Sequence, residues 1–467
     1  MANPASEQKV PFLQALFYAL PGLPIAWLIP PMYAILGDFY LRHTAATAAG
    51  IGTAMIVSKI VDAITDPPVG YLSDHTKTRI GARKPWIIAG TILCMITFLY
   101  LFNPGEEGGN GHFTVGIILY YISYTLVKIP YRSWLGEITK SYSERSRLWG
   151  YLTIGLLVGG VVIMVMPVVL SLESIGMFKT AEFDREMMSF IGMVGAVLMP
   201  LCIIPAILFV PEGQANAGAS PKMTDFFTPL LSLRPYQIFM LGYGFSALGF
   251  GIMYSTIIVA LSSYFGIADK IPLFLLFMVG AQVASIPFWE KAAKRYSKHG
   301  IWAFAWLIHG LIGPLFLLIE PDPSSFWILV GFGALTSILQ APHMLVPVSI
   351  MNDIVDYDTW KSGQSRSGSF MALYTFVDKV LHAVGFGIGY YIIAIFGYDP
   401  KAAVNDTWAI TGLMLAASII PSICFLIATV FLRRFPITPG RHKAILSRLN
   451  RRELNVEAVI LASPQHD

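Results

Sequence analysis

The chain has 467 residues, of which 55% are hydrophobic and only 13% are charged, with a net charge of +4 at pH 7. Soluble domains carry roughly a quarter charged residues, so this composition excludes an ordinary soluble protein. Apolar stretches long enough to cross a membrane follow one another along the chain. The three cysteines lie in such stretches without metal-ligand spacing, and we expect no metal site.

About 20 residues per span predict an all-α membrane protein with twelve transmembrane helices in two six-helix halves. The predicted spans are 12–36, 47–72, 85–104, 113–136, 149–172, 187–210, 235–265, 271–290, 301–319, 326–350, 369–397 and 406–432. A polar stretch rich in small residues near the midpoint is typical of a linker. We therefore divide the chain into an N-terminal half at 1–210, a cytoplasmic linker at 211–234, a C-terminal half at 235–432 and a basic cytoplasmic tail at 433–467.

Lysine and arginine are concentrated in alternate loops, with roughly 23 on one side of the membrane against about five on the other. The positive-inside rule makes the richer side cytoplasmic, so we expect both termini there, in the cell's inner (plasma) membrane. The tail after Pro439 predicts a basic amphipathic helix at the inner surface. Anchorage to anionic headgroups is its simple interpretation, and regulation is the alternative.

Glycine and proline interrupt the first predicted helix of each half. The residues are Pro21, Gly22, Pro24, Pro30 and Pro31 in the first span, and Gly242, Gly244, Gly249 and Gly251 in the seventh. Interrupted helices at matching positions of two halves point to a binding site at the bilayer midplane in transporters. Close helix packing through small residues is the alternative interpretation.

The second span contains charges that are costly inside a bilayer. Lys59, Asp62 and Asp66 recur at i, i+3 and i+7, which places them on one helical face. Pro67, next to Asp66, frees backbone carbonyl oxygens, and Thr65 adds a hydroxyl. These oxygens predict a site for a monovalent cation or a proton. The alternative is a buried ion-pair network with Lys59.

The fourth span places Lys128 and Arg132 one turn apart, with Tyr124, Tyr131 and Trp134 nearby. Cations of this kind bind an anionic group on a substrate, and aromatic rings stack on a sugar or another flat apolar face. Alternatively, Lys128 serves as a counter-ion for the carboxylates of the second span. Arg132 lies nearer the interface, where snorkelling explains it equally well.

The eleventh span carries Asp378, Lys379 and His382, for which a local Asp378–His382 pair and substrate contact are equal interpretations. We interpret His309 and His343 as hydrogen-bonded core residues. No glycine-rich phosphate loop, HExxH helix or nucleophile elbow in a strand context is present, and we therefore expect no enzyme.

The loop after the second span resembles the signature of the major facilitator superfamily. Its residues are Gly70, Tyr71, Leu72, Ser73, Asp74, Arg79, Gly81, Arg83, Lys84 and Pro85. A helix-end carboxylate facing clustered basic residues can latch the two halves in one state. The resemblance thus implies a gating role for Gly70, Asp74, Arg79, Arg83 and Lys84.

The run Val61–Pro67 resembles the second-helix motif of the glycoside-pentoside-hexuronide:cation symporters, the family that includes the melibiose permease and the animal lysolipid symporters. Further matches are 129–131, 352–357 and 376–379. The resemblance implies the twelve-helix major facilitator fold. It also implies cation positions at Asp62 and Asp66, neighbouring ligands at Thr65 and Thr125, and a lysine beside both sites at Lys379.

Three departures from the family pattern bear on the substrate. No Asp or Glu occurs between Phe12 and Leu36, where the melibiose permease has a sugar-binding carboxylate, so galactoside recognition of that kind is not expected. Lys128 stands in place of a carboxylate, and Arg132 in place of an aromatic residue. This exchange of charge should weaken sodium binding and favour an anionic substrate.

These observations predict a symporter that couples a sugar or glycoside, such as a hexuronide, to a proton or sodium ion by alternating access. The expected substrate contacts are Lys128, Tyr124, Arg132 and Lys379. We expect a monomer in the lipid bilayer with no nucleic-acid partner and no cofactor besides the coupling ion. The alternatives are a transporter of a lysolipid-like amphipathic molecule and a receptor that binds without translocation.

Overall fold

A computed structural model describes residues 9–28, 31–105, 107–139, 141–212, 233–363 and 366–462, and every regular element in this part of the chain is a helix. The first helices are α1 (Phe12–Ala19), α2 (Gly22–Ile25), the 3-10 turn η1 (Ala26–Leu28), α3 (Pro31–His43), α4 (Ala48–His75), α5 (Lys84–Leu101), α6 (Asn110–Ile138), α7 (Tyr142–Leu170) and α8 (Arg185–Phe209). The later ones are α10 (Arg234–Val259), the π-helical turn η2 (Ala260–Tyr264), η3 (Ala268–Lys270), α11 (Ile271–Arg295), α12 (Lys298–Ile312), η4 (Gly313–Leu318), η5 (Pro323–Ser325), α13 (Phe326–Ser362), α14 (Ser367–Ile395), α15 (Thr407–Met414), the π-helical turn η6 (Leu415–Ile419), α16 (Ile420–Arg433) and α17 (Pro439–Ala462).

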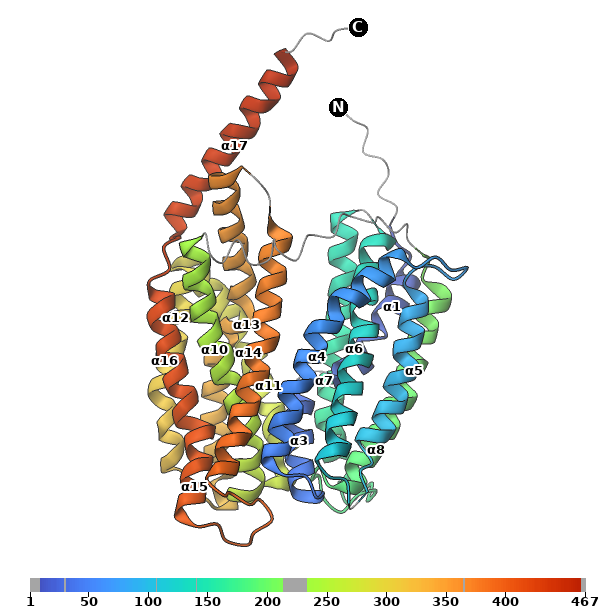
Figure 1. The fold of residues 1–467 in the computed structure, drawn as a ribbon, viewed down its shortest axis with the longest axis vertical. Coiled ribbons are helices and arrows are strands. Elements are labelled where there is room, and N and C mark those ends of the chain that lie inside the picture. Colours follow the sequence, from blue (N-terminus) through green and yellow to red (C-terminus); the bar gives the residue numbers. More distant parts are fainter. Residues whose placement is uncertain are drawn as a thin grey trace.

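The helices form two bundles, a first bundle of α1 to α8 and a second bundle of α10 to α16 (Figure 1). Across their interface α4 packs against α14, α3 against α10, and α7 against α11. Within the described residues eleven helices are long and apolar enough to cross a membrane, and a shorter apolar run covers Phe12–Leu28. The predicted all-α membrane fold is confirmed, with the first of the twelve expected spans present as a broken helix.

The two ends of the molecule are marked by different helices. The tail side carries α17, and the α15 side is the opposite end, with the short helix α15 (Figure 1). The predicted linker lies largely at residues 213–232, outside the described part of the chain. The ribbons of the two bundles diverge towards the tail side.

The hydrophobic cores differ between the two sides. One cluster of buried apolar side chains runs from Phe39 and Ile51 of the first bundle into Phe265 and Tyr390 of the second, close to the α15 side. A separate cluster fills the rest of the second bundle. Its members include Tyr236, Phe239, Trp302, Trp306 and Met351. Because burial of apolar area is the main stabilising contact, the bundles are held together on the α15 side.

Polar residues fix where several of the apolar helices begin. The side chains of Thr47, Asp184, Ser297 and Asp406 each accept a hydrogen bond from a backbone N–H in the first turn of α4, α8, α12 and α15. Such caps satisfy donors that have no partner within the helix. They set the ends, while the apolar composition sets the spans between them.

The predicted interruption of the first span is confirmed. The chain breaks between α1 and α2 and tightens to a 3-10 turn at η1, and the break lets Gly22 pack on α7, where an added Cβ would lie 2.8 Å from the Leu152 carbonyl oxygen. The predicted interruption of the seventh span is wrong, because α10 is continuous. Its glycines permit close packing instead: a Cβ on Gly251 would lie 2.2 Å from the His382 carbonyl oxygen.

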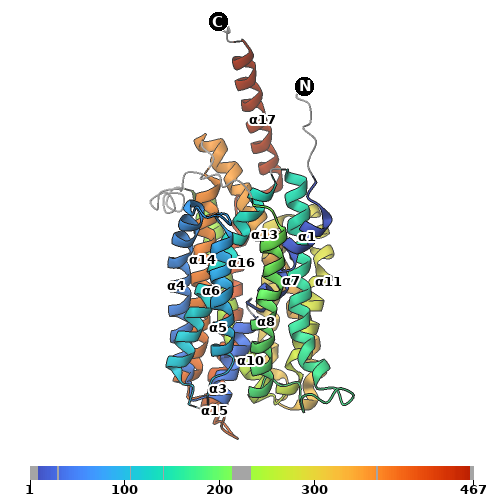
Figure 2. The ribbon, with the colours of Figure 1, turned by 90° about the vertical axis from the view of Figure 1, so that its right-hand side faces the viewer.

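The basic tail forms a helix as predicted, and α17 projects away from the bundles (Figure 2). Its first turns pack on the end of α13. His442 contacts Asp356 at 2.9 Å, and Arg448 lies over the Trp360 ring at 5.3 Å. Ile445 is buried in the second-bundle core. Protein therefore covers Ile445 of the apolar face, whereas Leu446 is exposed.

Candidate functional site

A charged cluster lies where α4 of the first bundle meets α14 of the second. The Lys379 ammonium is 3.0 Å from Asp62 Oδ2 and also donates to Asp66 Oδ2. The Thr125 hydroxyl on α6 lies 2.8 Å from Asp62 Oδ1 and 2.9 Å from Asp66 Oδ1. One ammonium and one hydroxyl therefore bridge two carboxylates that stand one helical turn apart.

The local sequence of α4 explains this geometry. A spacing of four residues brings Asp62 and Asp66 onto one face. Pro67 and Pro68 lie inside the continuous helix and lack backbone N–H groups, which leaves the carbonyl oxygens four residues earlier without their usual donors. The Asp62 side chain is only 2% exposed, whereas that of Asp66 is 25% exposed. Asp66 is thus the carboxylate nearer to an aqueous path.

Two further lysines border the cluster. The Lys59 ammonium is 3.7 Å from Asp62 Oδ2 and 3.7 Å from the centre of the Tyr121 ring. The Lys128 ammonium lies 4.7 Å from the centre of the Tyr124 ring, and no carboxylate of the described residues lies within 4.0 Å of it. The counter-ion role considered for Lys128 is therefore filled by Lys379 and Lys59.

Two expected site residues lie away from the carboxylate oxygens. The Thr65 hydroxyl donates to the Asp62 carbonyl oxygen at 3.1 Å, so it binds its own helix. Arg132 is exposed and lies over the Trp149 ring at 5.6 Å, one turn from Lys128 towards the tail side. Tyr124 lies beside the cluster, where its ring contacts the Lys128 ammonium.

The loop residues expected to form a gate cluster on the tail side. Arg83 pairs with Asp74, and its Nη2 lies 2.8 Å from Glu137 Oε1 on α6. Lys84 lies 3.9 Å from Glu212, and Gly70 faces Ile129. Arg79 is exposed. Among the described residues these contacts join helices of the first bundle to one another and to Glu212 just after α8, and none reaches the second bundle, so in this state the cluster does not latch the two bundles together.

An inter-bundle contact on the α15 side was missed by the sequence interpretation. Asp38 on α3 is buried and accepts a hydrogen bond of 2.6 Å from the Ser262 hydroxyl of η2. Arg42 donates to Asp38 at 2.9 Å and also pairs with Glu182. The adjacent His43 ring and Arg42 guanidinium hold the pKa of Glu182 at about 2. The sequence prediction missed Asp38 because the first span was expected to end at Leu36, which leaves Asp38 in a loop, whereas α3 continues to His43.

In the second bundle Asp378 and His382 form the local pair that was one of two interpretations. His382 Nδ1 lies 3.0 Å from Asp378 Oδ1, and the Tyr243 hydroxyl donates to the same oxygen. His309 is buried with its Nε2 3.4 Å from the Gln340 amide nitrogen, as expected for a core histidine. His343 stacks on Tyr243 with ring centres 5.2 Å apart.

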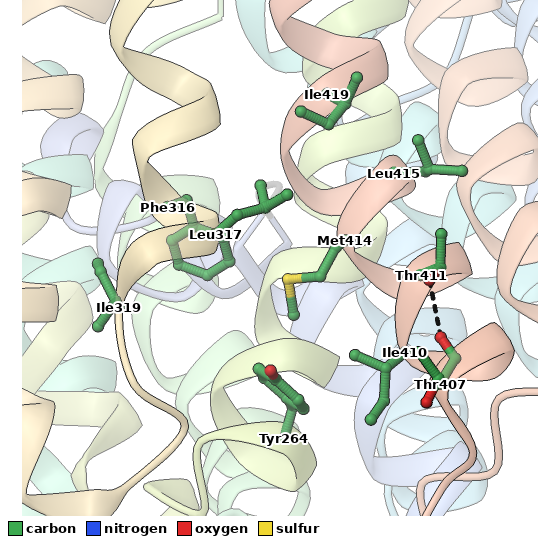
Figure 3. Close-up of a pocket in the computed structure, with 10 residues that line it drawn as sticks. All are labelled: Tyr264, Phe316, Leu317, Ile319, Thr407, Ile410, Thr411, Met414, Leu415 and Ile419. Carbon is green, nitrogen blue, oxygen red and sulfur yellow. Dashed lines mark hydrogen bonds between the residues drawn. The ribbon is translucent and has the colours of Figure 1, made fainter.

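An apolar pocket lies elsewhere, near the α15 side of the second bundle (Figure 3). Its volume is about 200 Å³. The lining residues are Tyr264, Phe316, Leu317, Ile319, Thr407, Ile410, Thr411, Met414, Leu415 and Ile419. The Thr411 hydroxyl donates to the Thr407 carbonyl oxygen at 2.7 Å. The pocket shares no residue with the charged cluster.

The sequence matches the model of a known protein family over most of its length. The model of the MFS/sugar transport protein family matches residues 16–439, nearly the whole chain. The chain belongs to this family. Because the matched family consists of transport proteins and eleven of the described helices are long and apolar enough to cross a membrane, the chain is a multi-pass membrane transport protein and not an enzyme.

Similar curated proteins cover most of the chain at low identity. The putative glycoside/cation symporter YagG of Escherichia coli K12 is 25% identical over 89% of this chain and 90% of its own length. The glucuronide carrier protein homolog of the same organism is also 25% identical, over 89% and 90%. The sodium-dependent lysophosphatidylcholine symporter 1 of Xenopus tropicalis is 23% identical over 82% and 79%.

Solved structures support the fold. The nucleoside transporter NupG matches with a TM-score of 0.67 at 13% identity, covering 92% of this chain and all of that one. A bacterial homologue of the lysosomal transporter Spinster, solved inward-facing and unoccupied, matches with a TM-score of 0.58 at 14% identity, over 94% and 96%. At these identities the likeness concerns the fold alone.

Proposed function

We propose that this transporter is a symporter that couples a proton or sodium ion to a sugar or glycoside bearing an acidic group, such as a hexuronide. The observation that carries the proposal is the bridge of Lys379 and Thr125 across Asp62 and Asp66 at the interface of the bundles. Paired carboxylates at the moving interface of a transporter bind cations and respond to bundle motion.

In this proposal the Lys379 ammonium occupies the place of the coupling ion. A proton or sodium ion that binds Asp62 and Asp66 competes with Lys379, because Lys379 and Lys59 together already balance the two carboxylate charges and Lys379 occupies oxygens of both. Thr125 supplies a hydroxyl ligand beside both carboxylates. Thr65, whose hydroxyl is bound to its own helix, takes part only if that bond breaks.

The released lysine links the two ligands. Lys128 has no carboxylate partner among the described residues, and it lies on a neighbouring helix beside Tyr124. A substrate carboxylate between Lys128 and a displaced Lys379 neutralises both, while Tyr124 offers an apolar ring face. Arg132 extends the positive path towards the tail side. Cation binding thus raises the affinity for an acidic substrate, and the reverse holds by linkage.

The proposed orientation places the tail side in the cytoplasm of the inner membrane, because basic residues are concentrated in the loops on that side. The shared apolar core and the Asp38–Ser262 contact on the α15 side support a state that is closed there. The gating set Gly70, Asp74, Arg79, Arg83 and Lys84 would then act in the opposite, outward state. We retain the division into halves at 1–210 and 235–432, and a monomer as the working unit.

A lysolipid-like substrate is the second candidate, and the apolar pocket of Figure 3 is the observation that favours it. An acyl chain suits a pocket lined by aliphatic and aromatic side chains. The pocket shares no lining residue with the charged cluster. Among the described residues, an amphipathic molecule therefore has no single site that would hold both its acyl chain and its charged group. We therefore place the acidic glycoside first.

The test is ligand-dependent thermal stabilisation of the purified protein. A ligand that binds only the folded state stabilises it by RT ln(1 + [L]/Kd), which is about 2.7 kcal/mol at 100 times Kd. Glucuronides, neutral glucosides and lysophosphatidylcholine are compared with and without sodium at pH 6 and pH 8. Stabilisation by a glucuronide that depends on sodium or pH is expected. Stabilisation by the lysolipid alone would contradict the proposal.

A further inference from the structure

The second bundle presents one carboxylate that the coupling scheme does not use. Asp378 adjoins Lys379 on α14, but its side chain turns to α10, where the Tyr243 hydroxyl donates to Oδ1. His382, one turn later, places Nδ1 3.0 Å from the same oxygen. Among the described residues these contacts both use Oδ1, so Oδ2 is the oxygen that remains for a ligand.

The Asp378 carboxylate is accessible at the depth of the charged cluster. Its side chain is 35% exposed and that of His382 is 31% exposed, although both lie mid-way along the 29-residue helix α14. An ionised carboxylate in a spanning helix faces a partner or a water-filled path, and Asp378 is next in sequence to Lys379, whose ammonium reaches Asp62 and Asp66 across the interface of the bundles.

Aromatic rings extend from this carboxylate along α10. The His382 ring centre lies 6.2 Å from that of Phe250, and Phe250 stacks on Tyr254 at 5.4 Å. The residue Tyr254 is 37% exposed, and its hydroxyl donates to Gln340 Oε1 at 3.1 Å. Phe250 is buried, so Tyr254 is the exposed ring of this run. A carboxylate oxygen together with an exposed aromatic ring suits a molecule that combines hydroxyl donors with flat C–H surfaces, which is the chemistry of a pyranose ring.

The other carboxylates of the central region are already engaged. Asp62 and Asp66 both accept from Thr125 and Lys379. The two central lysines of the first bundle, Lys59 and Lys128, are donors only. A sugar hydroxyl that donates a hydrogen bond therefore finds its charged acceptor in the second bundle.

We propose that Asp378 is a substrate-binding residue that accepts hydrogen bonds from ring hydroxyls of the glycoside, with Tyr243 and His382 as positioning residues that hold its carboxylate. This assignment rests on the proposed glycoside function and adds a contact between the second bundle and the sugar ring. The acidic group of the substrate lies at Lys128 in the first bundle, and its hydroxyls lie at Asp378 in the second. One molecule thereby contacts both bundles, as alternating access requires.

The experiment measures binding by titration calorimetry on the full-length purified protein, at fixed pH and sodium concentration. The probes are p-nitrophenyl β-D-glucuronide, the corresponding glucoside and galactoside, and the monodeoxy analogues of whichever glycoside binds. The variants are Asp378→Asn and Tyr243→Phe. The control is Asp322→Asn, the same chemical change on the exposed loop before α13, where Asn also caps a helix.

Replacing a charged acceptor by a neutral one should weaken binding of the parent glycoside about 10-fold in Asp378→Asn. Tyr243→Phe, which keeps the ring that stacks on His343, should give a smaller loss. For the monodeoxy analogue that lacks the recognised hydroxyl, wild type and both variants should bind alike, because the interaction is absent in each case. Asp322→Asn should match wild type throughout.

Each other outcome has a separate meaning. Unchanged binding of the parent glycoside by Asp378→Asn overturns the assignment of Asp378 and leaves the glycoside function in place. If the variant loses the same affinity for the parent glycoside and for every deoxy analogue, Asp378 acts through protein stability or net charge and not through a sugar hydroxyl. That result also overturns the inference. Failure of wild type to bind any of the glycosides overturns the proposed function, and the subsite with it.

Discussion

Removal of the Lys379 ammonium should raise the affinity of the transporter for its coupling ion while abolishing coupled uptake. The ammonium is 3.0 Å from Asp62 Oδ2, and its side chain is only 12% exposed. At an effective dielectric constant of about 20, the attraction is about 5 kcal/mol before desolvation is counted. If removal of the ammonium makes binding of the coupling ion more favourable by about 1.4 to 2.8 kcal/mol, the affinity for that ion rises about 10- to 100-fold.

The variant Lys379→Gln, with Lys179→Gln as a control at an exposed loop lysine, allows a direct assay. In sodium-free buffer at pH 8 the variant should unfold several degrees below wild type, because loss of one partner of a buried pair costs about 3–5 kcal/mol. Sodium chloride titrated at constant ionic strength, or a lower pH, should restore its unfolding temperature at lower ion concentrations than affect wild type. A folded variant with the same or weaker ion dependence would refute the reasoning.

Three further predictions concern the bundles themselves. Gly251→Ala should lower the free energy of unfolding by about 1–3 kcal/mol, since its Cβ would lie 2.2 Å from a carbonyl oxygen on α14, whereas Gly160→Ala, with open space around it, should not; thermal unfolding compares them. Glu182→Gln should lower the free energy of unfolding by at most about 3 kcal/mol. Because the pKa of Glu182 is lowered to about 2, the difference from wild type should be full above pH 5 and vanish as the pH falls towards 2. A difference that does not change with pH would contradict this. Ser262→Ala, which removes the hydrogen bond to Asp38, should increase the population open on the α15 side, seen as longer distances between spin labels placed on the loops of the two bundles there; unchanged distances would show that this contact does not hold the state.

The charged face of α4 could be predicted because helical periodicity alone places Lys59, Asp62 and Asp66 together. Their contact with Lys379 could be expected only from the family resemblance, since residues 313 positions apart are joined by tertiary packing. The Asp38–Ser262 contact spans 224 positions and follows no pattern in the sequence. Its one available signal was a carboxylate close to the end of an apolar stretch.

The pattern of one helix does not identify its neighbours. The glycines of the seventh span suggested a broken helix, but glycine serves a close approach as well as a break, and Gly251 contacts α14 through its backbone. The contact of α17 with a membrane surface stays a prediction: Ile445 packs on the second-bundle core, and Leu446 on the same helix is exposed. Sequence patterns define the face of a helix and do not identify what covers it.

Uphill uptake into proteoliposomes tests the central claim most directly. Purified protein is reconstituted, an inward sodium or proton gradient is imposed, and accumulation of a radiolabelled glucuronide is followed for wild type and Asp66→Asn. The account predicts accumulation above the external concentration in wild type, collapse of the gradient by ionophore, and no accumulation in the variant despite a normal unfolding profile. Binding without accumulation by wild type, or unchanged accumulation by Asp66→Asn, would contradict it.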